Sequence, residues 1–279
     1  MNAGLSIAVF VDCSLPTCYL ADSLLGAMAI PNSKLSTSNR QSDAELAKNV
    51  ALSCRILAKL GQFKETTGHV SARSESGASM LIRGRGKEES GLLFTKPSDV
   101  VAADFDGRML RDRAGLKTPN ESCIHGELYR ARPEVGAIVH AHPPSLVLTS
   151  MAGIELKPAF GGFDPRAMRL ALRPIPVFES SLTLHTKEQV HAMMDVMGDH
   201  DICIMRGHGV VVCGKSVEDA TVKAIKLDAL AEINLQLARL GKSATISEAD
   251  IAAFQNRTGK GDGSVQPVWR YYVEWLKRS

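Results

Sequence analysis

The stretch that decides this fold is Val135-Gly136-Ala137-Ile138-Val139-His140-Ala141-His142, an apolar run that ends in a His-x-His pair. Such a run is typical of a buried β-strand. In a strand, residues i and i+2 point to the same face, so the imidazoles of His140 and His142 can aim at one point. Two imidazoles from one strand leave coordination positions open on a divalent metal ion, and open positions are typical of catalytic metal sites.

A third histidine follows a second strand-like segment. It lies in Arg206-Gly207-His208-Gly209, directly after the apolar run 201–205. Glycines on both sides let other backbone segments approach closely. A His-x-His pair alone is more often a solvated strand end, but packing does not explain a third histidine in such a turn. The sequence therefore predicts a metal site built from His140, His142 and His208.

The composition argues against two classes of function. The 279 residues suit one domain, and 44% hydrophobic and 23% charged residues are typical of a soluble globular protein. The 33 basic and 30 acidic residues are spread along the chain without a basic run among aromatics, so we expect no nucleic-acid partner. Asp12 and Asp22 interrupt the apolar residues 5–30, and no basic residue precedes Lys34. This pattern favours neither a membrane helix nor a signal peptide.

Cysteines and turn residues indicate the compartment and the domain boundary. The six cysteines show no C-x-x-C spacing, which is typical of a reducing, cytoplasmic protein. Residues 31–43 are polar and rich in turn formers, as in a linker. We therefore predict an N-terminal extension over residues 1–43 and a single catalytic domain over residues 44–279.

Helical and strand patterns alternate after the linker. Alternation of this kind predicts an α/β protein in which one sheet lies between helical layers. Residues 157–180 are irregular and rich in glycine and proline, and 104–107 has the Asp-Gly signal of a hairpin turn. The predicted helices cover 44–60, 121–132, 144–152, 186–197 and 216–240, and the predicted strands lie at 68–73, 79–83, 91–95 and within 201–213.

The motifs and their order resemble those of the class II aldolase/adducin family. Gly68-His69-Val70-Ser71-Ala72-Arg73 resembles its Gly-Asn-x-Ser-x-Arg turn, and Glu121-x-x-x-His125 resembles its acid-bearing helix. The two histidine segments resemble its metal segments, and the resemblance covers about residues 44–245. It implies a central, mainly antiparallel sheet flanked by helices, and a homotetramer with active sites at subunit interfaces.

The resemblance also implies a role for each matching residue. His140, His142 and His208 would hold a Zn²⁺ or Mn²⁺ ion, and Glu121 would act as acid or base and as a fourth ligand. A Lewis-acidic metal that polarises an oxygen works together with a carboxylate that moves a proton. From the sequence alone, Glu121 is also explained as a helix N-terminal glutamate that complements the helix dipole. His125 and Tyr129, four residues apart on this helix, are expected to be packing residues.

Three positions depart from the sugar-phosphate aldolases of the family. His69 replaces the Asn of the first turn, Thr95-Lys96-Pro97-Ser98 replaces a Ser-Gly pair, and Pro119-Asn120 replaces a Ser-Ser pair before Glu121. A phosphate dianion needs several converging N–H and O–H donors, and proline lacks its backbone donor. We infer that the substrate is not a sugar phosphate.

Cationic side chains suit a carboxylate substrate instead. Their segments are expected near the pocket, although each of them alone is more often a surface charge. The loop Phe160–Arg169 adds two aromatic residues beside glycines and resembles the decarboxylase branch of the family, which acts on 3-hydroxy-2-methylpyridine-4,5-dicarboxylate or dihydroxyphthalate. In the family a C-terminal tyrosine often reaches an active site. The substrate-binding residues that we predict are His69, Arg73, Lys96, Arg166 and either Tyr271 or Tyr272, with Arg166 as first and His69 as second choice for a carboxylate anchor.

Three functions remain open from the sequence. The favoured one is a metal-dependent lyase that decarboxylates an ortho-hydroxy aromatic or heteroaromatic (di)carboxylate. The second is a class II aldolase or epimerase acting on a non-phosphorylated or unusual sugar-like substrate. The third is an adducin-like, non-catalytic scaffold, which has no reason to keep three histidines and an acid.

Overall fold

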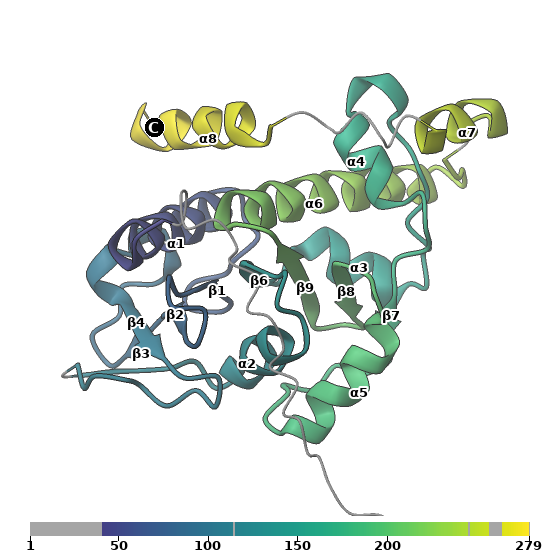
Figure 1. The fold of residues 1–279 in the computed structure, drawn as a ribbon. Helices are drawn as coiled ribbons and strands as arrows, with labels where there is room; N and C mark the ends of the chain where they lie inside the picture. The colour runs from purple at the N-terminus through teal and green to yellow at the C-terminus, as the bar shows by residue number, and fades with distance from the viewer. Residues whose placement is uncertain (1–40, 114, 245, 257–263, 279) are drawn as a thin grey trace, which may run out of the picture. The chain divides into compact units, whose positions relative to one another are not determined.

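The computed structural model describes residues 41–113, 115–244, 246–256 and 264–278 (Figure 1). Nearly all of the predicted N-terminal extension, residues 1–40, lies outside this part of the chain. The helices are α1 (Asp43–Lys59), α2 (Ser122–Ala131), α3 (Pro144–Met151), α4 (Pro165–Leu170), α5 (Lys187–Met197), α6 (Val217–Arg239), α7 (Glu248–Asn256) and α8 (Gln266–Arg278). The strands are β1 (His69–Arg73), β2 (Met80–Arg83), β3 (Arg85–Gly86), β4 (Val100–Ala103), β5 (Leu116–Lys117), β6 (Ala137–Ala141), β7 (Val177–Phe178), β8 (Ile202–Met205) and β9 (Gly209–Gly214).

Seven strands form the central sheet, in the order β4-β2-β1-β6-β9-β8-β7. Every neighbouring pair is antiparallel except β7 and β8. The strand β6 lies in the middle, and all five of its residues are buried. A strand covered on both faces reads as a continuous apolar run rather than an alternating one. The predicted α/β fold with a mainly antiparallel sheet is confirmed.

Helices cover both faces of the sheet (Figure 1). On one face α1, α3 and α6 pack over a core that includes Val139 of β6, and α8 packs on α1 and α6 from outside. On the other face α2 and α5 pack over a core that includes Ile138. Alternate residues of a strand face opposite sides. His140 therefore lies on the same side of the sheet as Ile138 and the helix α2.

Local signals account for the starts of two of the predicted helices, α1 and α5. The Ser42 hydroxyl accepts a hydrogen bond from the Glu45 N–H at the start of α1, and the Ser42 N–H donates to the Glu45 carboxylate. Thr186 and Gln189 form the same pair of bonds at the start of α5. Reciprocal caps of this kind satisfy backbone N–H groups that a helix end leaves open. The predicted turn at 104–107 is also present, with Gly107 at a φ of 80° and a bridge from Ala103 to Met109 behind it.

Two segment predictions were wrong. The predicted strand 91–95 is a 3₁₀ turn (Leu92–Phe94), because Gly91 has a φ of 84° and the Leu92 N–H bonds the carbonyl of Glu65, away from the sheet. The region 157–180 was predicted to be irregular but contains α4 and the edge strand β7. The two residues of β7 carry no strand pattern of their own, and pairing with β8 makes them a strand.

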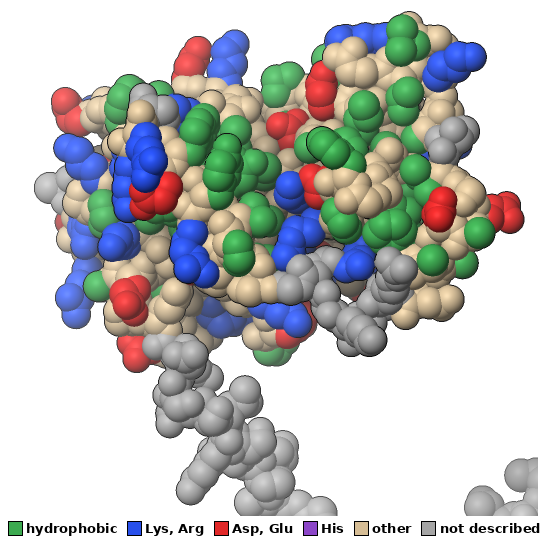
Figure 2. All heavy atoms as spheres, turned by 90° about the horizontal axis from the view of Figure 1, so that it is seen from above, with side chains coloured by type: hydrophobic (Ala, Val, Ile, Leu, Met, Phe, Trp, Pro, Cys, Tyr) green, Lys and Arg blue, Asp and Glu red, His purple; other side chains and the backbone are tan. Residues whose placement is uncertain are grey.

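The outer face of the α8 side bears clusters of hydrophobic side chains (Figure 2). Tyr271 of α8 is 63% exposed, and Phe163, two residues before α4, is 89% exposed. None of the described helices is long and apolar enough to span a lipid bilayer.

Candidate metal centre

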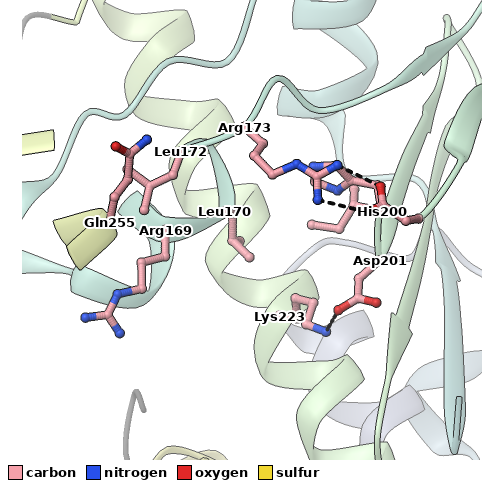
Figure 3. Close-up of a pocket in the computed structure, with 10 residues that line it drawn as sticks. Arg169, Leu170, Leu172, Arg173, His200, Asp201, Lys223 and Gln255 are labelled. Atoms are coloured by element: carbon pink, nitrogen blue, oxygen red, sulfur yellow. Dashed lines mark hydrogen bonds and ion pairs between the residues drawn. The ribbon is translucent and has the colours of Figure 1, made fainter. Parts of the chain in front are cut away.

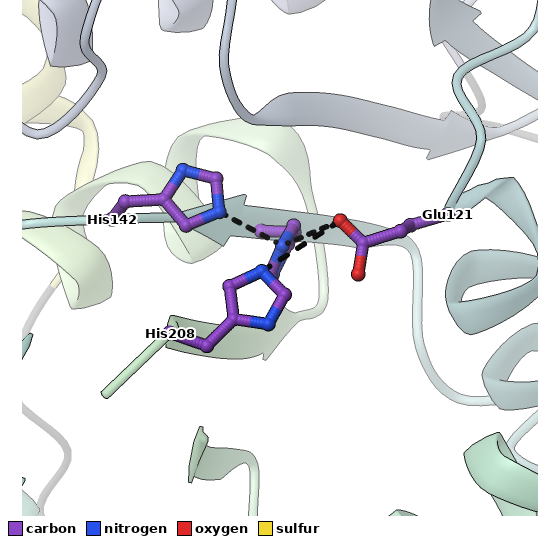
Figure 4. A group of neighbouring side chains, drawn as sticks. Glu121, His142 and His208 are labelled. Atoms are coloured by element: carbon purple, nitrogen blue, oxygen red, sulfur yellow. Dashed lines mark hydrogen bonds and ion pairs between the residues drawn. The ribbon is translucent and has the colours of Figure 1, made fainter. Parts of the chain in front are cut away.

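Four side chains from three parts of the chain converge at one end of the sheet (Figure 4). His140 and His142 extend from the end of β6, His208 lies in the turn between β8 and β9, and Glu121 is the residue at the start of α2. Each residue offers one ligand atom, and the four atoms all lie within 4.8 Å of one another. The structure thus brings together the predicted three histidines and the predicted acid.

The distances suit one divalent ion. Nε2 of His142 lies 3.1 Å from Nε2 of His140, which lies 3.3 Å from Oε2 of Glu121. Nε2 of His208 lies 3.8 Å from the same carboxylate oxygen. Tetrahedral nitrogen ligands of zinc lie about 3.3 Å from one another, given Zn–N bonds of about 2.0–2.1 Å. The donor set therefore fits one divalent ion.

Backbone groups orient these side chains. Nδ1 of His140 lies 3.1 Å from the carbonyl of Val210, and Nδ1 of His208 lies 3.0 Å from that of Leu182. A ring that donates Nδ1–H to a carbonyl keeps its lone pair on Nε2, which is the arrangement that a metal ligand needs. The Leu184 N–H donates to Oε1 of Glu121 at 3.0 Å, which leaves Oε2 facing the histidines.

The charge states also suit a metal. Burial first, and then the charges of His140 and His208, lower the pKa of His142 to about 3, and burial likewise lowers the pKa of His208. Burial alone would raise the pKa of Glu121, but the hydrogen bond and charge of His140 outweigh it and lower that pKa to about 2. Neutral imidazoles and an ionised carboxylate are the forms that bind a divalent ion.

Glu121 does not serve its own helix as a cap. It occupies the N-cap position of α2, but its side chain makes no capping hydrogen bond. Its two oxygens instead face Leu184 and the histidines. The carboxylate is thus oriented by the site and not by the helix end.

A glycine makes room for the second ligand. A Cβ on Gly209 would lie 2.3 Å from the carbonyl oxygen of Ala141 and 2.6 Å from the ring of His142. Both distances are far below van der Waals contact, so a larger residue there would displace His142. Gly209 therefore has the steric role that the sequence suggested.

His69 lies beside this cluster, but as a neutral group. It faces His140 across the β1–β6 pair, with their ring centres 5.0 Å apart. Burial, together with the charges of His125 and His140, holds its pKa well below the ordinary value. The expectation that His69 supplies a positive charge is wrong, because the sheet encloses its ring.

The predicted cation Arg73 binds backbone carbonyls away from the histidine cluster. It lies at the opposite end of β1 from His69, and its guanidinium donates to the carbonyls of Val135, Tyr129 and Arg132 at 2.8–2.9 Å. These bonds hold the end of α2 against the start of β6. Arg73 therefore faces backbone carbonyls and not the histidine cluster.

The other predicted substrate residues do not join the cluster within one chain. Lys96 is exposed at the start of a 3₁₀ turn, and Arg166 on α4 donates to the carbonyl of Ser264 at 3.1 Å. Tyr271 and Tyr272 lie on α8, outside α1 and α6 and on the other side of the sheet from α2 (Figure 1). A role for Arg166 or for these tyrosines thus depends on the predicted assembly of subunits.

Arg85 is a cation near His69 that was not among the predicted substrate-binding residues. It begins β3, with Gly84 between it and the end of β2, and its charge contributes to the low pKa of His69. Its guanidinium bonds Oε1 of Glu89 and Oγ1 of Thr66, each at 3.2 Å. The signal was present in Arg83-Gly84-Arg85, which continues a strand predicted beside the His69 segment.

A separate cavity of about 440 Å³ lies between α4, α6 and the loop before β8 (Figure 3). Two of its cations are already paired, Arg173 with Asp199 at 2.7 Å and Lys223 with Asp201 at 2.8 Å. Neither of them offers an uncompensated charge to an acidic ligand. The cavity contains none of the four converging ligands.

Comparisons with known proteins agree with this geometry. Residues 48–235 match the family model described as Class II Aldolase and Adducin N-terminal domain. The chain is 36% identical to a 3,4-dihydroxyphthalate decarboxylase of Arthrobacter keyseri, over 80% of this chain and 90% of that protein. It is 33% identical to the enzyme of that name from Rhodococcus jostii, over 80% and 93% of the two chains.

More distant similarities point to the same fold. A methylthioribulose-1-phosphate dehydratase of Pseudomonas fluorescens is 27% identical, over 69% of this chain and 93% of that protein. The crystal structure of an aldolase II superfamily protein from Pseudomonas syringae superposes with a TM-score of 0.74 at 20% identity, over 86% of this chain and 95% of that one. The relatives named here for an activity are lyases, which supports a lyase.

Proposed function

The chain belongs to the class II aldolase and adducin family, and on that premise we propose that it is a metal-dependent decarboxylase of an ortho-hydroxy aromatic di-acid such as 3,4-dihydroxyphthalate. The resemblance inferred from the motifs, including the decarboxylase branch, is confirmed. The observation that carries the proposal is the convergence of His140, His142, His208 and Glu121 in a chain similar to decarboxylases of that di-acid.

A divalent ion held by His140, His142 and His208, with Glu121 as a fourth ligand only in the resting enzyme, would supply Lewis acidity to substrate oxygens. The chain itself supplies the proton handling. Glu121 is ionised at neutral pH, and its Oε2 accepts no backbone hydrogen bond from the described residues, so this atom takes the proton of the substrate hydroxyl. The bond between the ring and the adjacent carboxylate then breaks, CO₂ leaves, and the electron pair remains on the ring carbon. Glu121 returns the proton to that carbon, and the phenolate oxygen takes one proton from water.

Arg85 is the residue that we propose as anchor for the second carboxylate, in place of Arg166. It bonds Thr66, three residues before His69, and shares the carboxylate of Glu89 with Arg83. Two guanidinium groups and one carboxylate leave one positive charge in this group. A carboxylate on the substrate would compensate it, and Arg suits a bidentate contact.

A sugar-phosphate lyase is the alternative that one comparison favours, since a methylthioribulose-1-phosphate dehydratase is similar over most of its length. His69 and Pro119 stand where sugar-phosphate aldolases have phosphate donors, and His69 already uses Nδ1 for a contact with His125. A phosphate dianion would therefore find few donors in these two places.

The test is turnover by the metal-loaded protein. We expect CO₂ and 3,4-dihydroxybenzoate from 3,4-dihydroxyphthalate, because the carboxylate beside a hydroxyl is the one that leaves. Methylthioribulose 1-phosphate is the competing substrate. Turnover of the sugar phosphate, with none of the di-acid, would overturn the proposal.

A further inference from the structure

A chain of buried polar side chains leads from the metal centre into the α2 side of the sheet. Nδ1 of His69 lies 2.7 Å from Nε2 of His125, and Nδ1 of His125 lies 2.6 Å from Oγ of Ser71. That hydroxyl lies 2.8 Å from the hydroxyl of Tyr129. All four residues are at most 4% exposed. His125 and Tyr129, expected from the sequence to be packing residues, are also hydrogen-bonded.

The direction of these hydrogen bonds follows from Tyr129, the last residue of the hydrogen-bonded series. Tyr129 has one O–H, and among the described residues Ser71 is the acceptor within reach of it, so Tyr129 donates to Ser71. Ser71 then donates its own proton to Nδ1 of His125. Nε2–H of His125 donates to Nδ1 of His69, so Nδ1 carries a lone pair and the ring proton of His69 lies on Nε2.

The opposite direction leaves a buried donor unsatisfied. If Nδ1–H of His69 donated to His125, Ser71 would donate to Tyr129, and the Tyr129 O–H would point at no acceptor among the described residues. A buried donor without an acceptor is costly, whereas a phenol oxygen with unused lone pairs is not. Only one arrangement, therefore, gives each of the three inner donors an acceptor.

We propose that Tyr129, Ser71 and His125 hold His69 in its Nε2–H form, as a neutral hydrogen-bond donor beside the metal centre. This inference rests on the proposed function. The fixed Nε2–H group makes His69 a specificity-determining residue that binds an anionic oxygen of the aromatic acid. Ser71, His125 and Tyr129 are positioning residues that act through it. A fixed neutral donor selects a carboxylate or phenolate oxygen without the cost of burying a charge.

The experiment reads the tautomer itself. Protein labelled with ¹⁵N-histidine, without metal and then with Zn²⁺, gives ring-nitrogen shifts that distinguish Nδ1–H from Nε2–H, and loss of one signal set in His69→Gln assigns His69. We expect a single Nε2–H form in the wild type. Ser71→Ala removes the donor to His125 and should give a mixture of the two tautomers. Ser71→Thr keeps the hydroxyl and should restore the single form.

Binding of a probe tests the consequence. Phthalate titrated into the Zn²⁺-loaded protein should bind about tenfold more weakly to His69→Leu than to the wild type, since hydrogen bonds to charged groups are among the stronger ones. A wild-type His69 protonated on Nδ1, or an unchanged tautomer in Ser71→Ala, would overturn the proposal. Both NMR outcomes are independent of catalysis, so they stand apart from a failure of the decarboxylase assignment.

Discussion

Acid should destabilise the metal-free protein through histidines that the fold buries in neutral form, and His125 makes the effect measurable. His125 is 0% exposed, and burial, followed by the charge of His140, lowers its pKa from 6.5 to about 3. Between these two values the unfolded chain binds a proton that the folded chain does not. Stability therefore falls as the pH drops from about 6.5 toward 3, and it is fully present above 6.5.

The magnitude follows from the two pKa values. Each pH unit inside this window removes about 1.4 kcal/mol. Between pH 6 and pH 4, His125 alone should account for roughly 2.5 kcal/mol of the lost free energy of unfolding. Other buried histidines add to the total, so the wild type alone does not isolate this contribution.

A variant isolates it. His125→Gln keeps a polar side chain of similar reach but does not titrate, while His69, His142 and His208 remain. Urea unfolding of both proteins at a fixed protein concentration, from pH 7 to pH 4, gives two slopes of stability against pH. The slope of the variant should be smaller by about 1.4 kcal/mol per pH unit. Equal slopes would refute the reasoning, because His125 would then be protonated alike in both states.

Further predictions concern the site and the assembly. His142→Ala should lose bound metal and activity, and stoichiometric zinc in the purified variant would contradict the ligand assignment. Glu121→Gln should fold and lose about a hundredfold or more in kcat, whereas Glu134→Gln, 64% exposed, should not, so equal losses in the two would leave Glu121 without a proton-transfer role. Arg85→Met should lower kcat/KM for the di-acid about tenfold, with the exposed Lys87→Met as control, and parallel losses in both would exclude a specific anchor. Light scattering at micromolar concentration should give a tetramer, and a monomeric mass would refute the predicted assembly.

Short-range patterns in the sequence were sufficient for part of the site. The spacing of two residues between His140 and His142 places both on one face of any strand, wherever that strand pairs. The caps of α1 and α5 lie within three residues of the groups that they bond. These features depend on local geometry alone, so they could be predicted without knowledge of the fold.

Pairing between distant segments decided the rest. His69 faces His140 because β1 pairs with β6, and His125 reaches His69 because α2 packs on the same face. No local pattern indicates that Arg73 bonds the distant backbone carbonyls of Val135, Tyr129 and Arg132, or that Arg85 lies near His69. The sequence by itself determined which residues have the type and spacing of metal ligands, and which of them share one face of a strand or helix. Only the tertiary structure decided which side chains are buried together, and hence their charge states, because desolvation depends on every segment that packs around a group.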